Sequence, residues 1–226
     1  MSRAIRLLVL LLLTFPFAAQ ADEGFYPIKA DDGSIIANHR VPVEIEGRIE
    51  TLPGIVIVGN PHGAVTLAEF YDVNCPFCRA ASPDIEKLLK QNRELKLVLV
   101  PFPVLGIPSI QATRIELAVA RLAPPQQFYR FHRMLDDLRG TADGTRALAA
   151  AKAIGLDQKK VLAIANQDQL AEVMTAHLRL GDDLAIQATP GFVIKGVAIV
   201  GYPGPNALAK IVASVDRCGA VICENQ

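Results

Sequence analysis

The sequence predicts an α/β fold in which a block of helices interrupts a sheet, and three observations lead to this prediction. Residues 64–102 have the pattern strand, helix, strand; residues 109–181 keep a helical spacing of apolar side chains; and residues 192–200 return to β-forming residues. A strand–helix–strand unit is typical of α/β proteins. Because β character resumes after the helices, we expect the helices to be inserted between two parts of one sheet.

The N-terminus has the pattern of a secretory signal. Two arginines precede the apolar run at residues 7–13, and Ala19-Gln20-Ala21 has the small-residue pattern that signal peptidase accepts. The alternative is a membrane anchor, but the apolar stretch contains a proline and is shorter than the roughly 20 residues that a span needs. We therefore expect residues 1–21 to be cleaved and the mature protein not to insert into a membrane.

The next segments lead up to the first strong motif. Residues 22–54 form a polar N-terminal extension with a turn at residues 32–33. The pattern does not show whether this extension packs on the domain or mediates assembly. Residues 55–58 are predicted to form a short strand, and residues 64–73, which are rich in β-forming residues, a second strand that runs directly to Cys75.

A helix and a further strand are predicted after Cys75. Pro76 suits a first helical turn, and Ile85 and Leu88 then recur at helical spacing. Residues 95–102 alternate and then become continuously apolar, which is the pattern of a buried strand.

Residues 109–181 are predicted to contain about four helices. The boundary signals are the glycines Gly140, Gly155 and Gly181, where helices should stop, and the N-cap candidates Asp157 and Asp168. Short strands at residues 192–194 and 197–200 and a helix at about 206–217 are expected to complete the fold.

The composition excludes some classes of function. The chain has 226 residues, of which 51% are hydrophobic, and it carries 23 basic and 23 acidic side chains. Such a chain is expected to be globular, and it lacks the basic field that attracts phosphate, so nucleic acid is not an expected partner. An exported chain of this size folds without disulfide staples, so its four cysteines call for a chemical explanation.

The most specific signal is Cys75-Pro76-Phe77-Cys78, a Cys-x-x-Cys motif at the junction of a strand and a helix. The unpaired N–H groups and the positive dipole of a helix N-terminus stabilise an anion, so the pKa of Cys75 should be low. Cys75 can then attack a disulfide as a thiolate. Cys78, one helical turn further on, can attack the resulting mixed disulfide and release the substrate.

Two other uses of the motif are half of a zinc site and an inert disulfide. A zinc site would need Cys218 and Cys223, which lie far along the chain at a spacing unlike that of compact zinc sites. The histidines do not cluster in sequence, and His132 and His177 lie in phase with apolar residues, so we interpret both as helix-packing side chains. No metal site is therefore expected.

Residues 69–79 read Glu-Phe-Tyr-Asp-Val-Asn-Cys-Pro-Phe-Cys-Arg, and Thr189-Pro190 precedes a predicted strand. Together with the helical block, these features resemble the DsbA-like family of bacterial periplasmic thiol:disulfide oxidoreductases over most of residues 55–217. The resemblance implies a thioredoxin-like fold at residues 55–226 with an inserted helical domain at about 109–185. It also implies a periplasmic location, no cofactor, exported cysteine-containing proteins as substrates and a membrane redox partner.

The resemblance also gives roles to residues outside the motif. Thr189-Pro190 matches the family's cis-proline loop, whose backbone can accept a substrate peptide as an extra strand beside Cys75; the alternative is an ordinary trans proline. Glu69 lies in a strand expected to be covered on both faces. As a buried acid it should have a raised pKa and exchange a proton with Cys78, whereas the alternative is a surface glutamate on an edge strand.

Two departures from the family pattern leave the direction of electron flow open. Phe77 stands where strongly oxidising members have a histidine, so we expect Pro76 and Phe77 to tune a milder oxidant. Thr189 also resembles the residue found in exported isomerases and reductases. The rival functions are therefore a disulfide isomerase or reductase and, from another class, a non-catalytic chaperone or metal-binding module of the same fold.

Cys218 and Cys223 are expected to form a structural disulfide. They follow the last predicted helix, Gly219 is available to end that helix, and a local turn can bring the two sulfurs within bonding reach. Exported chains keep such bridges oxidised, and the bridge would pin the C-terminal tail. The alternatives are two free buried thiols and a pair that exchanges disulfides with Cys75, which the spacing does not support.

Overall fold

The fold is that of a computed structural model, which describes residues 25–223 of the chain. The predicted signal peptide at residues 1–21 lies outside the described residues. No helix between residues 25 and 223 combines the length and the apolar character that crossing a membrane requires.

The described residues form a six-stranded mixed sheet in the order β1-β6-β5-β3-β4-β2. The strands are β1 (Asn38–Arg40), β2 (Val56–Gly59), β3 (Val65–Tyr71), β4 (Leu95–Pro101), β5 (Gly191–Ile194) and β6 (Val197–Val200). The central strands β3 and β4 are parallel, and every other neighbouring pair is antiparallel. Strands β2 to β6 lie where the sequence pattern predicts them, whereas β1 was not predicted.

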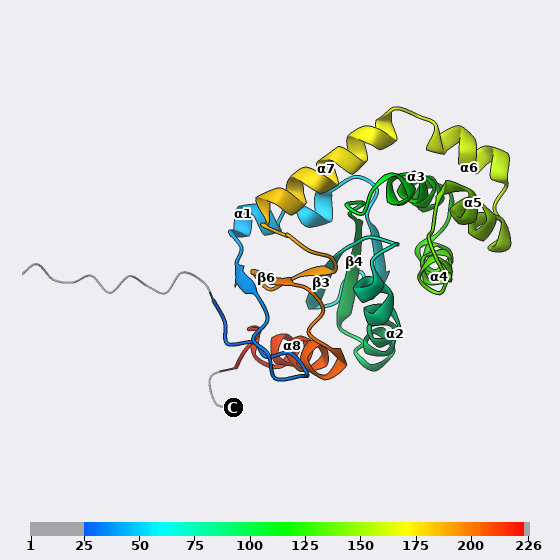
Figure 1. The fold of residues 1–226 in the computed structure, drawn as a ribbon. Helices are drawn as coiled ribbons and strands as arrows, with labels where there is room; N and C mark the ends of the chain where they lie inside the picture. Colours follow the sequence, from blue (N-terminus) through cyan, green and yellow to red (C-terminus); the bar gives the residue numbers. More distant parts are fainter. Residues whose placement is uncertain (1–24, 224–226) are drawn as a thin grey trace, which may run out of the picture.

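Helices cover both faces of this sheet, and a helical block lies at its side (Figure 1). The helices are α1 (Val43–Glu46), η1 (Ile49–Thr51, a 3-10 helix), α2 (Pro76–Gln91), α3 (Ile107–Leu122), α4 (Pro125–Asp136), α5 (Gly144–Ala153), α6 (Gln158–Ala165), α7 (Gln169–Asp183) and α8 (Pro205–Cys218). Helix α7 lies on one side of the sheet and α8 on the other, with α3 to α6 forming the insertion. The predicted α/β thioredoxin-like fold with a helical insertion is confirmed.

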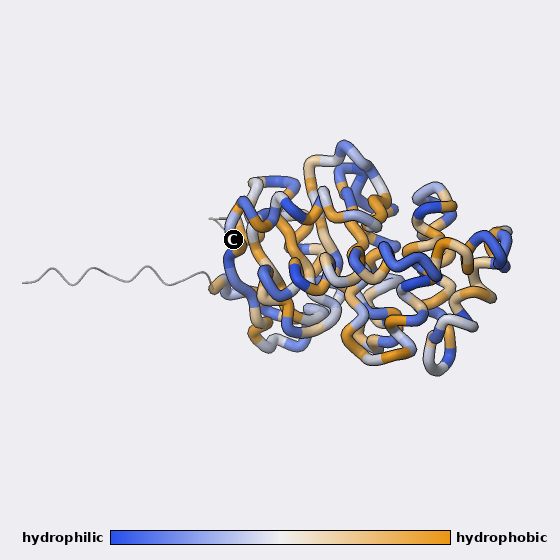
Figure 2. The backbone as a smooth tube through the Cα atoms, turned by 90° about the horizontal axis from the view of Figure 1, so that it is seen from above, coloured by the Kyte–Doolittle hydropathy of each residue, from blue (hydrophilic) through white to orange (hydrophobic). Residues whose placement is uncertain are grey.

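The strand that leads to the motif is buried on both faces. Leu67 and Tyr71 of β3 belong to the core shared with α2, α8 and the helical block. Their neighbours Ala68 and Phe70 point to the opposite face, where they pack in a second core with Leu180 of α7. Figure 2 shows the hydropathy along the backbone, with apolar stretches through the middle of the molecule and both polar and apolar stretches at its periphery.

The N-terminal extension packs on this domain from residue 25 onward. Strand β1 pairs with β6 and so adds an edge strand to the sheet. The carboxylate of Asp31 accepts hydrogen bonds from the backbone N–H groups of Asn206 and Ala207 at 3.0 and 2.7 Å, and so caps the start of α8. The extension is therefore attached at both the sheet and the last helix.

The helical region differs from the prediction in three ways. Residues 107–183 contain five helices instead of about four. Gly181 does not end a helix: it lies inside α7, at a point where a Cβ atom would run into the ring of Phe102. Asp157 caps α6 through the N–H of Lys160 as predicted, but Asp168 makes no side-chain cap to α7. The close packing of α7 on the sheet thus explains why position 181 is a glycine, although the sequence pattern suggested that the helix ends there.

Candidate active site

Cys75 lies at the N-cap of α2 because the chain turns sharply after β3. The Cys75 N–H donates to the backbone carbonyl of Asp72 at 2.9 Å, and the Asp72 carboxylate accepts from the N–H of Asn74 at 2.8 Å. Cys75 has extended φ and ψ angles of −73° and 121°, and Pro76 takes the first helical position. The sulfur of Cys75 is consequently placed at the N–H groups that open the helix.

The two cysteines of the motif are reduced and differ in acidity, although only 3% of either residue is exposed. Hydrogen bonds from the Cys78 thiol, the Thr189 side chain and the backbone N–H groups at Cys78 and Phe77 lower the pKa of Cys75 to about 6, although burial opposes this shift. Burial raises the pKa of Cys78 far above its usual range, with further contributions from Cys75 and Glu69. Cys75 is therefore the thiolate at neutral pH, and Cys78 holds its proton.

The loop before β5 reaches the Cys75 sulfur. The Thr189–Pro190 peptide bond is cis, and Gly191 pairs with Phe70 near the end of β3. This register carries Thr189 to the active-site edge of the sheet, where its carbonyl lies 3.0 Å from the Cys75 sulfur and accepts a hydrogen bond from it when Cys75 is protonated. The two chain segments singled out in the sequence thus meet at one sulfur.

Glu69 lies in β3 and is 3% exposed. Burial raises the pKa of Glu69 to about 8; the charge of His132 opposes this shift, and the charges of Asp136 and Cys75 add to it. A carboxyl with such a pKa can take up or release a proton near neutral pH. The structure therefore places Glu69 in the buried environment that its strand pattern suggested, and not on an edge strand.

The residues between the two cysteines face outward. Pro76 and Phe77 are exposed, and the Phe77 side chain is among the exposed large hydrophobic groups, with 63% of the residue accessible. Phe77 contributes its backbone N–H to the Cys75 sulfur. Its side chain supplies no charge there.

Sequence reasoning missed the residues that tie the active-site turn to the helical block. Asp72 accepts a hydrogen bond from the hydroxyl of Ser109 at 2.7 Å. Asn74 donates to that hydroxyl and to the Ala142 carbonyl. Arg79 donates to backbone carbonyls at residues 73, 138 and 140. Only their proximity to Cys75 in the sequence could have pointed to them.

A second feature that the sequence did not reveal is a buried group, here named the His132 cluster, formed by His132, Glu116, Asp136 and Tyr71. His132 Nδ1 lies 3.6 Å from Glu116 Oε1, and Nε2 lies 3.3 Å from Asp136 Oδ2. The Tyr71 hydroxyl donates to Glu116 Oε1 at 3.1 Å. His132 does pack within the helices as interpreted, but it does so against carboxylates.

Cys218 and Cys223 form a disulfide with a Cα–Cα distance of 6.1 Å, and Gly219 ends α8 in the left-handed conformation with φ of 70°. Helix α8 starts after β6 at the active-site edge, and its 14 residues carry the chain about 20 Å away. The disulfide is thus remote from Cys75. Across residues 25–223, no group of three or more His, Cys, Asp and Glu side chains is arranged to hold a metal ion.

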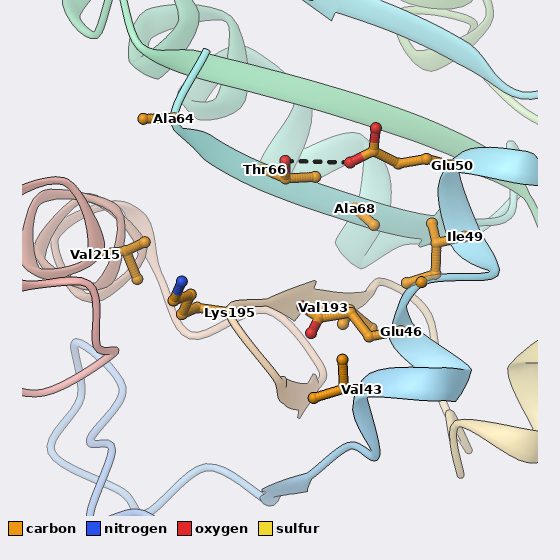
Figure 3. Close-up of a pocket in the computed structure, with 11 residues that line it drawn as sticks. Val43, Glu46, Ile49, Glu50, Ala64, Thr66, Ala68, Val193, Lys195 and Val215 are labelled. Carbon is orange, nitrogen blue, oxygen red and sulfur yellow. Dashed lines mark hydrogen bonds between the residues drawn. The ribbon is translucent and has the colours of Figure 1, made fainter. Parts of the chain in front are cut away.

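A separate pocket lies on the face of the sheet occupied by α1 and η1 (Figure 3). Three of its polar side chains form hydrogen bonds with their neighbours: Thr66 donates to Glu50 at 3.4 Å, and Glu46 accepts from the N–H of Gly196 at 2.7 Å. Neither cysteine of the motif lines it. The pocket is therefore distinct from the redox site.

Comparison with solved structures gives three similar proteins. A thioredoxin-like oxidoreductase from Silicibacter pomeroyi DSS-3 is 29% identical, with a TM-score of 0.67 over 74% of this chain and 93% of that one. The thiol-disulfide exchange protein alpha-DsbA2 from Wolbachia pipientis is 25% identical, with a TM-score of 0.70 over 76% and 92%. A periplasmic thioredoxin-like protein from Salmonella enterica serovar Typhimurium is 26% identical, with a TM-score of 0.66 over 77% and 97%.

The curated proteins give no match to this chain. A family model described as thioredoxin, however, matches residues 51–214, which include both cysteines of the motif and the cis-proline loop. The resemblance to DsbA-like proteins is confirmed by the similar structures. The chain therefore belongs to the thioredoxin family and carries the cysteine pair of a thiol-disulfide oxidoreductase.

Proposed function

We propose that the protein exchanges disulfides with exported protein substrates in the periplasm, with Cys75 as nucleophile and Cys78 as resolving thiol. The observation that carries this proposal is the position of the Cys75 sulfur, between the N-terminus of α2 and the Thr189 carbonyl before cis-Pro190. A helix N-terminus favours a thiolate, and the loop offers backbone to an extended peptide.

The reaction has two thiol exchanges. The Cys75 thiolate attacks a substrate disulfide, so that one substrate sulfur leaves as a thiolate and the other is bonded to Cys75. Cys78 then gives its proton to the Glu69 carboxylate and attacks the Cys75 sulfur. The substrate sulfur leaves as the second thiolate, and the Cys75–Cys78 disulfide forms. Run in reverse, the same steps oxidise two substrate thiols.

Substrate binding is assigned to the loop at Thr189 and Pro190. A peptide that pairs with this loop as an added strand would bring its own disulfide alongside the Cys75 sulfur, which already contacts the Thr189 carbonyl at 3.0 Å. Pairing through main-chain hydrogen bonds depends little on the side chains of the substrate. A broad range of exported substrates is therefore expected.

The direction of the reaction depends on the stability of the reduced thiolate. A pKa of about 6 at Cys75 favours the reduced form relative to a free cysteine, which makes the disulfide an oxidant. Phe77 supplies no charge that would strengthen this effect. We propose a moderate oxidant recycled by a membrane redox partner, with disulfide isomerisation or reduction as the alternative.

A periplasmic location is supported by the predicted signal peptide and by a similar Salmonella protein that is described as periplasmic. We propose export with removal of residues 1–21. The mature chain recovered from the periplasm of a bacterial host should begin at Asp22. Recovery of the uncleaved chain from the cytoplasm would contradict export.

The catalytic proposal is tested by insulin reduction and by oxidation of a dithiol peptide. The Cys75→Ser variant should lose both activities, because no other thiol of the motif is ionised near neutral pH. The matched control is Cys218→Ser/Cys223→Ser, which removes two cysteines remote from the site and should retain both activities. Activity that survives Cys75→Ser would sink the proposal.

A non-catalytic chaperone makes the opposite prediction. Such a protein would prevent the aggregation of an unfolded client equally well after Cys75→Ser/Cys78→Ser substitution, and would lack exchange activity in the wild type. We assign Cys218 and Cys223 a structural role at the end of α8, where their bridge holds the tail.

A further inference from the structure

The His132 cluster lies against the active-site helix one turn beyond the resolving cysteine. Ser82 follows Cys78 by four residues and is on the same face of α2, where both side chains are buried. The Ser82 hydroxyl donates to Asp136 Oδ2 at 2.5 Å and also bonds the Arg133 guanidinium. The cluster in the helical block is therefore joined directly to the helix that carries Cys78.

The same cluster also reaches the strand that carries Glu69. Tyr71 follows Glu69 by two residues, so the two side chains point to the same face of β3. The Tyr71 ring lies 4.5 Å from the His132 ring, centroid to centroid, and its hydroxyl donates to Glu116. The strand that carries Glu69 and the helix that carries Cys78 thus contact the cluster from two sides, through Tyr71 and Ser82.

Acidic groups outnumber the basic group in and around the His132 cluster. Glu69, Glu116 and Asp136 are 3%, 0% and 6% exposed, and the side chain of His132 is 5% exposed. Three buried carboxyl groups thus surround one buried imidazole, and buried carboxylates are costly without a compensating cation. Within the cluster His132 is the residue that can supply this cation; Arg133, outside the cluster, reaches Asp136 alone, with its Nη1 atom 3.9 Å from Oδ2.

The contacts of the imidazole favour its charged form. Both ring nitrogens of His132 point at carboxylate oxygens, and a neutral imidazole has only one N–H to donate. Neither His132 Nδ1 nor Glu116 Oε2 forms a hydrogen bond with another group among the described residues. A protonated ring presents a donor to Glu116 and to Asp136 simultaneously.

We propose that His132 is a positioning residue for the resolving half-reaction, in which it acts as the buried cation that favours the ionised form of Glu69, the form that accepts the Cys78 proton. This inference rests on the proposed function. In the step concerned, the S–H bond of Cys78 breaks and its proton goes to Glu69, while the Cys78 sulfur bonds to Cys75. The bond from Cys75 to the substrate breaks, and the substrate sulfur keeps the electron pair.

The electrostatics agree with this role. Burial by itself would lower the pKa of His132, but Asp136 and Glu116 raise it to about 9, so the ring is charged at neutral pH. That charge in turn lowers the pKa of Glu69 against the effect of burial. The charged and aromatic groups around His132 are Glu69 and Tyr71 from β3, Glu116 from α3, and Phe128, Tyr129 and Asp136 from α4. Ser82 of α2 and Arg133 of α4 lie behind them and bond to Asp136 and to each other.

The test isolates the resolving step in the full chain. Reduced protein is mixed with glutathione disulfide at acid pH to place glutathione on Cys75, and glutathione release is followed after a jump to higher pH. We expect the wild-type rate to rise with a midpoint near pH 8, where Glu69 ionises. In His132→Gln the midpoint should move up by about one pH unit, with release about tenfold slower at pH 7.

The matched control is His177→Gln. His177 is equally buried, in α7, but its ring nitrogens face the backbone carbonyls of Pro101 and Pro53 and no carboxylate. Its midpoint should stay at the wild-type value. A shift of equal size in both variants would indicate general loosening of the fold and would overturn the role given to His132.

The protonation state of His132 tests the proposal in the wild-type protein, without any variant. Nitrogen NMR of the wild-type protein should show the His132 ring doubly protonated at pH 7, and a neutral ring at that pH would contradict the proposal. An unshifted midpoint in folded His132→Gln would overturn this inference alone, because thiol exchange would still be intact. A wild-type chain that never releases glutathione at any pH would instead overturn the proposed function, and this inference with it.

Discussion

The acidity of Cys75 depends on a small number of neighbours. The Cys78 thiol, the Thr189 side chain and two backbone N–H groups outweigh burial and bring the pKa of Cys75 to about 6. Cys78 lies one helical turn further along α2, where burial raises its pKa, so that it keeps its proton. The same four-residue motif therefore yields one acidic thiol and one that holds its proton, because its two sulfurs meet different surroundings.

Phe77 offers a direct test of how far this acidity can be tuned. Phe77→His should place a partly protonated imidazole beside the Cys75 sulfur, and a neighbouring positive charge stabilises a thiolate. The pKa of Cys75, read from thiolate absorbance, should fall below 6, and the reduction potential should rise. Phe77→Gln is the uncharged control and should change neither quantity. If Phe77→His leaves both unchanged, the backbone N–H groups alone set the acidity.

The sequence indicated the reacting residues better than the residues that support them. Cys75 and Cys78 follow from a motif and its position, because thiol exchange requires cysteines, whereas Thr189 and Pro190 were indicated by the resemblance to DsbA-like proteins. His132 was interpreted as a packing residue, since helical phase reports which side is buried but not which groups lie there. Its partner Glu116 comes from another helix, and only the fold brings the two together.

At the scale of elements, the packing of α7 on the sheet depends on a missing side chain. Gly181 lies inside α7, against the ring of Phe102 at the end of β4. Gly181→Ala should therefore destabilise the protein by about 1–3 kcal/mol, because the new methyl group overpacks a filled core. Urea unfolding measures the change.

The matched control for Gly181→Ala is Thr175→Ala, at an exposed position of the same helix. Surface substitutions of this kind usually change stability by less than about 0.5 kcal/mol. If Gly181→Ala is as stable as the wild type, or more stable, the helix gains more from alanine than the contact with Phe102 costs, and the packing explanation of this glycine is wrong.

Elements with strong local patterns were predictable, and those specified by distant partners were not. Strands β3 and β4 are long apolar runs, which are typical of strands buried on both faces. Strand β1 is a short polar segment, Asn38–Arg40, that is a strand because it pairs with β6. Its existence depends on an edge of the sheet that the local sequence does not describe.

At the scale of the whole molecule, the helical block and the sheet enclose ionisable groups between them. Glu69 comes from the sheet, and Glu116, His132 and Asp136 come from the block. The folded protein therefore holds protons that an unfolded chain would release. This arrangement connects the protonation state of the redox site to the stability of the fold.

Stability should consequently fall as the pH rises from 6 to 9. The pKa of Glu69 is about 8 in the folded protein against 4.5 as its ordinary value. Between these two pH values the unfolded chain ionises this carboxyl while the folded protein keeps it protonated, so the free energy of unfolding falls as the pH rises to 8. The pKa of His132 is about 9 against 6.5, so its stabilising contribution is complete below pH 6.5 and is lost as the pH passes 9. Both groups bind more protons in the folded state, so both effects have the same sign.

This prediction is best measured in the Cys75→Ser/Cys78→Ser background, because the low pKa of Cys75 would give the reduced protein an opposite trend as the pH rises. The free energy of unfolding from urea titrations should decrease by a few kcal/mol across this range. Adding Glu69→Gln should flatten the decrease. A stability that stays level or rises between pH 6 and 9 would show that neither group has the protonation described.

The central claim, that Cys75 is the nucleophile and Cys78 the resolving thiol, is tested most directly by trapping the intermediate. Cys78→Ser protein mixed with oxidised insulin should accumulate a mixed disulfide at Cys75, which mass spectrometry identifies without reduction. Cys75→Ser protein should form none, since Cys78 is buried and holds its proton. Equal adducts in the two variants, or adducts only at Cys78, would contradict the assignment.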